Sequence, residues 1–358
     1  MTNRGGPLAG VRIVEMEAIG PVPLAAMILA DMGADIVRLV RPGSHAMGGS
    51  VLARSRATVE ADLKTPEGRE TALALIDKAD ALLEGYRPGV MERLGLGPEA
   101  VRARNPRLVF GRMTGWGQTG PFAPTAGHDI NYISLTGALH AIGKDGEPPV
   151  PPLNLVGDYG GGAMFLVSGV LAGIIRARET GQGDIVDVAM TEGTMTLLSM
   201  FHAFLAAGRW QDRREANLLD GGAPFYRCYA CADGGHVAVG CLEPQFYAAC
   251  LAGLGLDPAD WPQHDVARWP AMAEAFAARF LIRTRDEWAE RFAGTDACVT
   301  PVLNFAEAPG HPHNVARGSY IEAGGVTQAA PAPRFANAVT RVGSSQALSA
   351  QAAITRWQ

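Results

Sequence analysis

Residues 11–40 decide the fold of this chain and read VRIVEMEAIGPVPLAAMILADMGADIVRLV. Val11–Met16 is a short apolar run, which is typical of a strand buried on both faces. Pro21 opens an apolar stretch and Gly33 ends it, as at the two ends of a helix. Asp35–Val40 predicts a second strand. Strand, helix and strand in this order predict one βαβ unit of a parallel sheet.

The same alternation continues along the chain. Apolar residues at helical spacing follow Pro66, and further strands are predicted at Ala81–Glu84 and Arg107–Met113. Residues 128–142 and 158–179 are expected to be mostly helical. Strands and helices in alternation predict an α/β fold with a Rossmann-like parallel sheet. The chain after the first strand lacks G-x-G-x-x-G, however, so a dinucleotide cofactor is not supported.

The composition changes near residue 228, which predicts a domain boundary. We expect a large α/β domain over residues 1–227. Two strands then flank Ala232–Gly235 as a hairpin and helical segments follow, so a smaller α+β domain is expected over 228–310. The segment 311–358, rich in Pro, Gly and Ala, is expected to return to the large domain.

Composition argues against several classes of protein. The chain has 358 residues, of which 47% are hydrophobic, as expected for a folded chain of about two domains. A net charge of −5 argues against nucleic acid as a partner. No signal peptide is recognised, and the longest apolar stretch, Ala163–Ile175, is shorter than the roughly 20 residues that span a bilayer. We therefore expect no membrane segment.

The cysteines predict neither a disulfide framework nor a metal site. They are five, few and odd in number, which fits a reducing compartment such as the cytoplasm. Cys228 and Cys231 form an isolated C-x-x-C without a second ligand pair. His311 and His313 lie in a loop rich in Gly and Pro, without acidic ligands nearby. The sequence therefore predicts no metal.

Three residues are candidates for chemistry by position, and each has a plainer alternative. His128 stands just before an apolar helix, where it is either a base or part of a helix cap. Asp158 precedes three glycines, where it is either a reactive carboxylate or an N-cap. Glu243 follows the second hairpin strand, where it is either functional or a turn residue. By themselves these patterns indicate only a soluble α/β enzyme.

Longer sequence motifs are more specific than these single residues. They are GHDINY at Gly127–Tyr132, PLNLVGD at Pro152–Asp158, EPQFY at Glu243–Tyr247, LEGYRPG at Leu83–Gly89 and GWGQTG at Gly115–Gly120. In these motifs the chain resembles the α-methylacyl-CoA racemase family, within the class III CoA-transferase superfamily. The resemblance implies an interlocked homodimer, with each active site between the large domain of one chain and the small domain of the other. It also implies a 2-methylacyl-CoA substrate that is inverted at Cα, with neither a metal nor an organic cofactor.

The resemblance assigns roles to individual residues. His128 and Asp158 match the two acid/base residues of the family, and Glu243 matches a carboxylate that orients the histidine. Arg93 matches an arginine that lines the site, and Asp129 completes the GHD triplet. An imidazole and a carboxyl group on opposite faces of Cα can remove and deliver a proton in either direction. Backbone N–H groups at the glycine-rich helix start near Asp158 are expected to hold the enolate oxygen.

The same resemblance predicts where coenzyme A binds. The expected residues are Arg41, Glu60, Ala61, Asp62, Leu63, Glu84, Gly85, Tyr86, Arg93, Gly127, His128, Asp129, Ile130, Asn131 and Tyr132. Most of them follow predicted strands, and ligands of open α/β sheets bind at the carboxyl ends of strands. Arg54 and Arg56 are further candidates for contacts with the CoA phosphates.

Two other functions stay open at this point. A class III CoA-transferase would use Asp158 as a nucleophile that forms a mixed anhydride with the acyl group. The histidine of the GHD triplet favours the racemase, because transferases generally lack it. The other alternative is a catalytically silent acyl-CoA-binding protein, against which the joint retention of His128, Asp158 and Glu243 argues. The acyl group itself is not determined, since Leu218 stands where relatives usually carry methionine.

Overall fold

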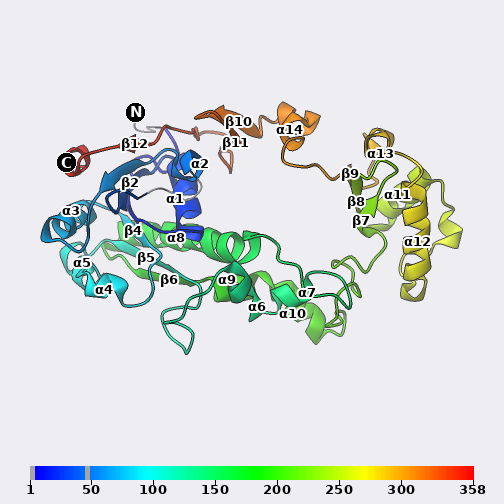
Figure 1. The fold of residues 1–358 in the computed structure, drawn as a ribbon, viewed down its shortest axis with the longest axis horizontal. Helices are drawn as coiled ribbons and strands as arrows, with labels where there is room; N and C mark the ends of the chain where they lie inside the picture. Colours follow the sequence, from blue (N-terminus) through cyan, green and yellow to red (C-terminus); the bar gives the residue numbers. More distant parts are fainter. Residues whose placement is uncertain (1–4, 45–48) are drawn as a thin grey trace. The chain divides into compact units, whose positions relative to one another are not determined.

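A computed structural model describes residues 5–44 and 49–358 of the chain (Figure 1). The chain divides into two compact units, each with a hydrophobic core of its own. The large unit contains Met1–Ala138, Pro152–Ser199 and His313–Gln358, and the small unit contains Leu139–Pro151 and Met200–Pro312.

The large unit is built on one parallel sheet. Among the described residues this sheet has seven strands, in the order β12-β3-β2-β1-β4-β5-β6. Val14 of β1 pairs with Val37 of β2 on one side and with Leu82 of β4 on the other. The predicted α/β class with a Rossmann-like sheet is confirmed. The strands are β1 (Arg12–Met16), β2 (Asp35–Val40), β3 (Ala57–Glu60), β4 (Ala81–Glu84), β5 (Val109–Thr114), β6 (Ile185–Ala189) and β12 (Gln346–Ala347).

Helices cover both faces of this sheet (Figure 1). They are α1 (Pro21–Asp31), α2 (Gly49–Ala53), α3 (Pro66–Ile76), α4 (Val90–Arg93), α5 (Pro98–Arg104), α6 (Asp129–Ser134), η1 (Leu155–Ala163), α8 (Met164–Thr180), α9 (Met190–Leu197) and α15 (Ala350–Arg356). Successive residues of β1 point to opposite faces, as a strand requires. Ile13 packs with residues of α1 and α8, whereas Val14 packs with residues of α3, α5 and α15. The sheet is therefore buried between two layers of helices.

Local sequence explains where the first helices begin. Gly20 precedes α1 with a φ of +70°, which glycine adopts without strain, and Pro21 has the φ that the first helical position requires. Thr65 caps α3, because its Oγ1 accepts the backbone N–H of Gly68 at 3.0 Å. α1 and α3 thus begin at the prolines that the sequence pattern indicates.

The region around the catalytic candidates differs from the expected helices. The helix expected over 128–142 is interrupted, because Gly137, with a φ of +90°, separates α6 from α7 (Ala138–Ala141). Asp158 lies on η1, a π-helix that continues directly into α8. A Cβ at Gly161 would lie 2.7 Å from the backbone nitrogen of Thr194, so this glycine lets α9 approach η1 closely.

The combined helix η1–α8 is longer than the apolar run expected from the sequence. By length and composition alone, the 26 residues Leu155–Thr180 could cross a membrane. Half of its most apolar segment is buried, however, and α8 packs on β5 through Leu166 and Val170. A buried core helix passes the same test of length and hydropathy as a membrane span.

The small unit has an antiparallel sheet beside a helical layer. In the described chain this sheet has three strands in the order β7-β8-β9. One face packs on an aromatic core that includes Phe225, Phe276 and Trp288. The predicted hairpin is confirmed as β7 and β8. The elements are α10 (Ser199–Ala206), β7 (Tyr226–Ala230), β8 (His236–Gly240), α11 (Pro244–Leu254), α12 (Trp269–Phe280), α13 (Arg285–Phe292) and β9 (Val299–Pro301).

The small unit contains more of the chain than the domain predicted from residue 228 onward. Arg214 explains much of the difference, because its guanidinium donates to three backbone carbonyls, of His140 at 2.8 Å, Lys144 at 2.9 Å and Glu147 at 2.7 Å. These bonds hold residues 139–151 against the segment that precedes the β7-β8 hairpin. Such long-range contacts leave no local pattern in the sequence.

The C-terminal segment lies with the large unit. It forms the hairpin of β10 (Tyr320–Ala323) and β11 (Val326–Ala329). Further on, β12 pairs in parallel with β3, and Trp357 at the end of α15 is buried in the core.

Candidate active site

Two cavities of the large unit lie at the carboxyl ends of its parallel strands. We name each after one lining residue: the His128 cavity, of about 630 Å³, and the Arg41 cavity, of about 580 Å³. The two cavities adjoin, because Ile19, Gly85 and Tyr86 line both. This is the edge of an open α/β sheet at which ligands bind.

His128 and Asp158 both line the His128 cavity. His128 is the N-cap residue of α6 and has an extended backbone, and its N–H donates to Oδ1 of Asn131 at 3.1 Å. This bond fixes the backbone of His128 and leaves its imidazole exposed on the cavity side. The cap and the catalytic interpretation of this residue are therefore compatible.

Asp158 is half-buried on η1, and its environment favours the protonated form. Burial raises the pKa of the Asp158 carboxyl, and the nearby charge of Asp129 raises it further. The amide of Asn154, which donates to Oδ2 of Asp158 at 3.2 Å, and the charge of His128 act in the opposite direction but do not reverse the shift. A Cβ at Gly20 would lie 2.9 Å from the same oxygen, so glycine at this position leaves room for the carboxylate.

Asp129 lies behind the residues that line the His128 cavity. Its side chain is buried, and its Oδ2 accepts the backbone N–H groups of Gly157 and Asp158, each at 2.7 Å. These bonds tie the start of α6 to η1, so they set the spacing between His128 and Asp158. Asp129 does not line the cavity, but it is bonded to the backbone of Asp158, which does.

The same bonds occupy two backbone donors near Asp158. The N–H groups of Gly157 and Asp158 are bound to Asp129 and are not available to an enolate oxygen. The expectation for the glycine-rich helix start stays a prediction.

An aromatic cluster forms one wall of the His128 cavity. Tyr132 donates its hydroxyl hydrogen to the carbonyl of Gly127 and meets Trp116 edge to face at 4.8 Å. Trp116 in turn lies 5.1 Å from Phe122, between ring centroids. A Cβ at Gly115 would overlap the ring of Tyr132, so Gly115 is needed for this packing. The wall is mostly aromatic, which suits the binding of an apolar group.

The Arg41 cavity is lined by more cations than carboxylates: Arg38, Arg41 and Lys64 against Glu17 and Asp62. The side chain of Arg41 is 81% exposed, and its backbone N–H donates to Oε2 of Glu17 at 3.1 Å, which holds the turn after β2. Lys64 adds a second exposed cation to the lining. Arg38, which the sequence analysis did not propose, lines this cavity although it is only 5% exposed. A charged residue between the apolar residues Val37 and Leu39 was the signal that could have identified it.

Most of the residues expected to bind coenzyme A line these two cavities. Those in the Arg41 cavity are Arg41, Ala61, Asp62, Leu63, Gly85 and Tyr86. Those in the His128 cavity are Gly127, His128, Tyr132, Gly85 and Tyr86. The remaining expected residues, which line neither cavity, are Glu60, Glu84, Arg93, Asp129, Ile130 and Asn131.

Glu84 holds the turn that follows β4. It is fully buried and accepts the backbone N–H of Tyr86 at 2.7 Å and Nε of Arg112 at 2.9 Å. Burial raises the pKa of Glu84 to about 7. These bonds shape the turn at which Gly85 and Tyr86 enter both cavities. Glu60, the last residue of β3, has a comparable role, since it accepts the N–H of Gly43 in the turn after β2 at 3.2 Å.

Arg54 and Arg56 do not line either cavity, and their expected role as phosphate contacts there is wrong. Arg54 is buried and pairs with Asp31 at 2.5 Å, and Arg56 is buried and pairs with Glu15 at 2.5 Å. Both arginines belong to ion pairs inside the large unit. The sequence offers no local sign of these partners, which are more than twenty positions away.

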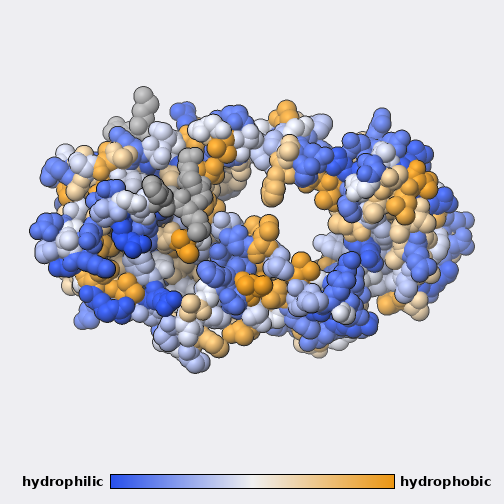
Figure 2. All heavy atoms as spheres, in the orientation of Figure 1, coloured by the Kyte–Doolittle hydropathy of each residue, from blue (hydrophilic) through white to orange (hydrophobic). Residues whose placement is uncertain are grey.

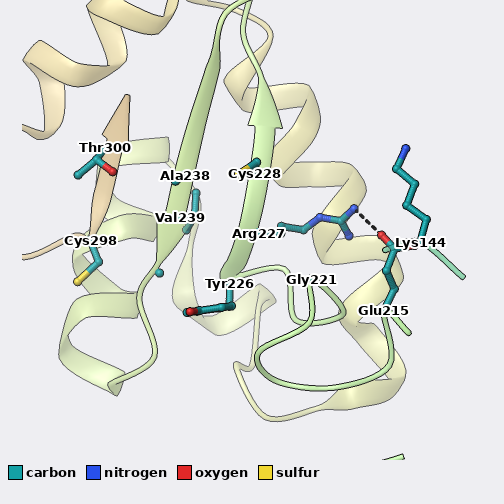
Figure 3. A pocket seen from close by; sticks show the side chains of 11 residues that line it. Lys144, Glu215, Gly221, Tyr226, Arg227, Cys228, Ala238, Val239, Cys298 and Thr300 are labelled. Atoms are coloured by element: carbon teal, nitrogen blue, oxygen red, sulfur yellow. Dashed lines mark ion pairs between the residues drawn. The ribbon is translucent and has the colours of Figure 1, made fainter. Parts of the chain in front are cut away.

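Glu243 belongs to the small unit, where it is exposed at the N-cap position of α11. Burial, the thiol of Cys241 and the Glu243 carboxylate together raise the pKa of the exposed Cys298. A cavity of about 610 Å³ lies on the open face of the β7-β8-β9 sheet, where Tyr226, Cys228 and Thr300 line it (Figure 3). The carboxylate of Glu215 pairs with Arg227 at 3.6 Å on its rim (Figure 3).

Comparison with known proteins gives consistent matches. The sequence model of CoA-transferase family III matches residues 8–350. Alpha-methylacyl-CoA racemase of Mus musculus is 46% identical over 335 residues, which are 93% of this chain and 87% of that protein. Alpha-methylacyl-CoA racemase of Homo sapiens is 45% identical over 315 residues, 88% and 82% of the two chains. The crystal structure of a CAIB/BAIF family protein from Brucella suis has a TM-score of 0.83 at 23% identity and covers 99% of this chain and 100% of that one, a likeness in fold alone.

Proposed function

This chain belongs to CoA-transferase family III, and from that premise we propose that it is a racemase that interconverts (2R)- and (2S)-2-methylacyl-CoA thioesters. The observation that carries the proposal is the presence of an imidazole and a carboxyl group of raised pKa, His128 and Asp158, in one cavity beside a cationic cavity. The racemase names of the two mammalian relatives support the same assignment.

In the proposed reaction, two groups act on opposite faces of Cα. His128 removes the α-proton of the (2S)-thioester to form an enolate, and protonated Asp158 delivers a proton to the other face. The reverse direction uses the Asp158 carboxylate as base and the His128 imidazolium as acid. A raised pKa of Asp158 suits this task, because it makes the carboxylate a stronger base and the carboxyl easier to keep protonated than an ordinary aspartate. The protein groups supply the chemistry, and neither a metal nor an organic cofactor is required.

The Arg41 cavity is the proposed site for the phosphates of coenzyme A. Arg41 and Lys64 are exposed cations in this cavity, and guanidinium groups bind phosphates in a bidentate manner. The adjoining His128 cavity would then receive the acyl part of the thioester against Trp116 and Tyr132. Arg93, exposed at the end of α4, remains a proposed contact by family resemblance.

We further propose a homodimer in which Glu243 of one chain completes the site of the other. Supporting this, large apolar side chains lie at the surface of α6, η1 and α9: Ile130 is 43% exposed, Leu155 is 55% exposed and Leu197 is 49% exposed. Hydrophobic residues at the surface over α6 and α9 are visible in orange in Figure 2. Exposed apolar groups of this kind mark association surfaces. A cytoplasmic location is proposed as well, since all five cysteines of the described chain are free.

The deciding experiment is the fate of the α-proton in D₂O. With either enantiomer of a 2-methylacyl-CoA, the racemase exchanges deuterium into Cα and inverts the configuration. A CoA-transferase would instead move CoA to an added carboxylic acid through Asp158, without rapid α-deuteration. Acyl exchange without α-deuteration would therefore replace the racemase by the transferase, and CoA binding with neither reaction would indicate a silent acyl-CoA-binding protein.

A further inference from the structure

We propose that Arg112 and Glu92 are positioning residues for coenzyme A, because together they hold α4 in place along the Arg41 cavity. This inference rests on the proposed function, which assigns the Arg41 cavity to the phosphates of coenzyme A. Neither Arg112 nor Glu92 lines the Arg41 or the His128 cavity. Each therefore acts on the substrate through the elements that it joins.

Arg112 lies inside the large unit, on β5, and is only 6% exposed. In the sheet it stands opposite Glu84 of β4 on one side and Asp187 of β6 on the other. Its Nε donates to Oε1 of Glu84 at 2.9 Å. A buried guanidinium is costly unless carboxylates accept its hydrogen bonds, so the partners of Arg112 indicate which parts of the fold it joins.

The other two nitrogens of the Arg112 guanidinium reach α4. Nη1 donates to Oε1 of Glu92 at 2.8 Å and Nη2 donates to Oε2 of the same carboxylate at 3.3 Å. A two-point contact of this kind fixes direction as well as distance. A Cβ at Gly97 would lie 2.8 Å from Cγ of Glu92, so glycine at this position leaves room for the side chain. The ion pair thus joins α4 to the central sheet.

The helix α4 depends on such contacts for its position. It has only four residues, and a helix of this length is not stable by itself. Val90 begins α4 and Leu94 directly follows it, and both line the Arg41 cavity. Met91 anchors the helix in the core, and Glu92 supplies its polar anchor. The bond from Arg112 to Glu92 therefore sets where this wall of the cavity stands.

The same guanidinium supports a second wall of the Arg41 cavity. Glu84, which accepts Nε of Arg112, also accepts the backbone N–H of Tyr86 at 2.7 Å. Tyr86 lines both cavities. Arg112 thus holds the turn after β4 and the helix α4 at a fixed separation. Because none of these contacts involves His128 or Asp158, we expect the affinity for the substrate, rather than the chemical step, to depend on them.

The charge of Glu92 distinguishes a positioning role from an electrostatic one. Glu92 is a carboxylate, 44% exposed, on a helix that borders a cavity proposed for phosphates. Removing its negative charge would by itself favour an anion bound nearby. Removing its bond to Arg112 would instead loosen α4 and disfavour the anion. A positioning role therefore predicts weaker binding of coenzyme A, whereas charge alone predicts tighter binding.

Glu92→Ala tests this proposal, and the exposure of Glu92 makes this variant compatible with folding. Its KM for a 2-methylacyl-CoA should rise by roughly tenfold, the factor that one hydrogen bond between charged groups typically represents, while kcat stays close to that of the wild type. The Kd of coenzyme A, measured by titration calorimetry, should rise with it. Glu92→Gln, which keeps an acceptor oxygen, should show a smaller rise. A 2-methylacyl-pantetheine, which lacks the nucleotide, should have the same KM in Glu92→Ala and in the wild type.

Two further variants serve as controls. Glu99→Ala removes an equal charge from an exposed position on α5 and should not raise the KM or the Kd. Arg112→Lys keeps the charge but loses the fork of donors, so it should raise the KM as Glu92→Ala does. Glu92→Ala added to Arg112→Lys should change the KM little further, because both substitutions break the same contact.

Wild-type values of KM and Kd in Glu92→Ala, tighter binding of coenzyme A, or additive losses in the double variant would overturn the proposal. The Kd comparison separates it from the proposed function. A wild type that binds coenzyme A without racemising a 2-methylacyl-CoA would refute the racemase, while the Kd values would still decide the role of Glu92. A wild type that binds no coenzyme A would overturn both.

Discussion

The carboxylate of Asp129 accepts the backbone N–H of Asp158 at 2.7 Å, and the same oxygen accepts the N–H of the preceding glycine. This contact joins the helix that begins after His128 to the π-helix that carries Asp158. It also brings a negative charge close to the Asp158 carboxyl, whose pKa it helps to raise. Asp129 therefore affects both the position and the proton affinity of one proposed acid/base residue.

Asp129→Asn separates these two effects. The amide oxygen of asparagine can still accept both N–H groups, but the charge that raises the pKa of Asp158 is gone, so this pKa should fall. In the direction that uses the Asp158 carboxylate as base, the acidic limb of the pH profile of kcat/KM should move to lower pH. An acidic limb at its wild-type pH in this variant would rule out the charge effect. Asp129→Ala serves as the control for position, since it leaves the two N–H groups without their acceptor and should lower kcat at every pH.

Removing one of the two proposed bases should block inversion in both directions. His128→Ala and Asp158→Ala should each lower racemisation by about 10²–10⁴-fold, the usual effect of losing a positioned acid/base group. Residual deuterium exchange should be confined to the (2R)-thioester in His128→Ala and to the (2S)-thioester in Asp158→Ala, measured by NMR in D₂O. If either variant inverts its substrate at a rate close to that of the wild type, the two-base mechanism is incorrect.

Arg41→Ala should raise the KM for acyl-CoA more than it lowers kcat. The reason is that Arg41 lies in the cavity proposed for the CoA phosphates, away from His128 and Asp158. Arg104→Ala is a matched control, because Arg104 is exposed and pairs with Asp77 outside both cavities. Equal KM values for wild type and Arg41→Ala in steady-state kinetics would remove Arg41 from the proposed site.

Two inactive variants should complement each other if the site is shared between chains. Glu243 belongs to the small unit and Asp158 to the large unit, so a mixed dimer of Glu243→Ala and Asp158→Ala contains one site with both residues intact. Refolding the two variants together should restore a fraction of the activity, while each variant refolded alone should stay inactive. Verified mixed dimers without activity would show that Glu243 and Asp158 act within one chain.

The buried pair of Arg54 and Asp31 should matter for stability. Both side chains are at most 5% exposed, and Arg54 also donates to Oε1 of Gln328 at 2.7 Å. Arg54→Met leaves a buried carboxylate unpaired and should lower the free energy of unfolding by about 3–5 kcal/mol, measured by urea denaturation. Arg104→Met breaks a partly exposed pair and should cost less than about 1 kcal/mol. Equal losses in the two variants would contradict this assignment.

The sequence alone was sufficient for the parallel sheet and for most of the residues around the candidate site. Val11–Met16 and Asp35–Val40 are recognisable as strands because burial on both faces requires apolar residues at adjacent positions. Pro21 and Gly33 mark the ends of the first helix because their backbone preferences are local. The sequence motifs around His128 and Asp158 indicated the family, which the comparisons confirm.

Only the tertiary structure decided how distant residues share charge and hydrogen bonds. It buried Arg54 and Arg56 in ion pairs, although both were expected to meet phosphate, and it placed Asp129 beneath η1 rather than at the cavity wall. It also identified Arg38 as a residue that lines the Arg41 cavity. A side chain's neighbours along the sequence determine its local conformation, but its burial and charge partners depend on which segments the fold brings together, so no local pattern records them.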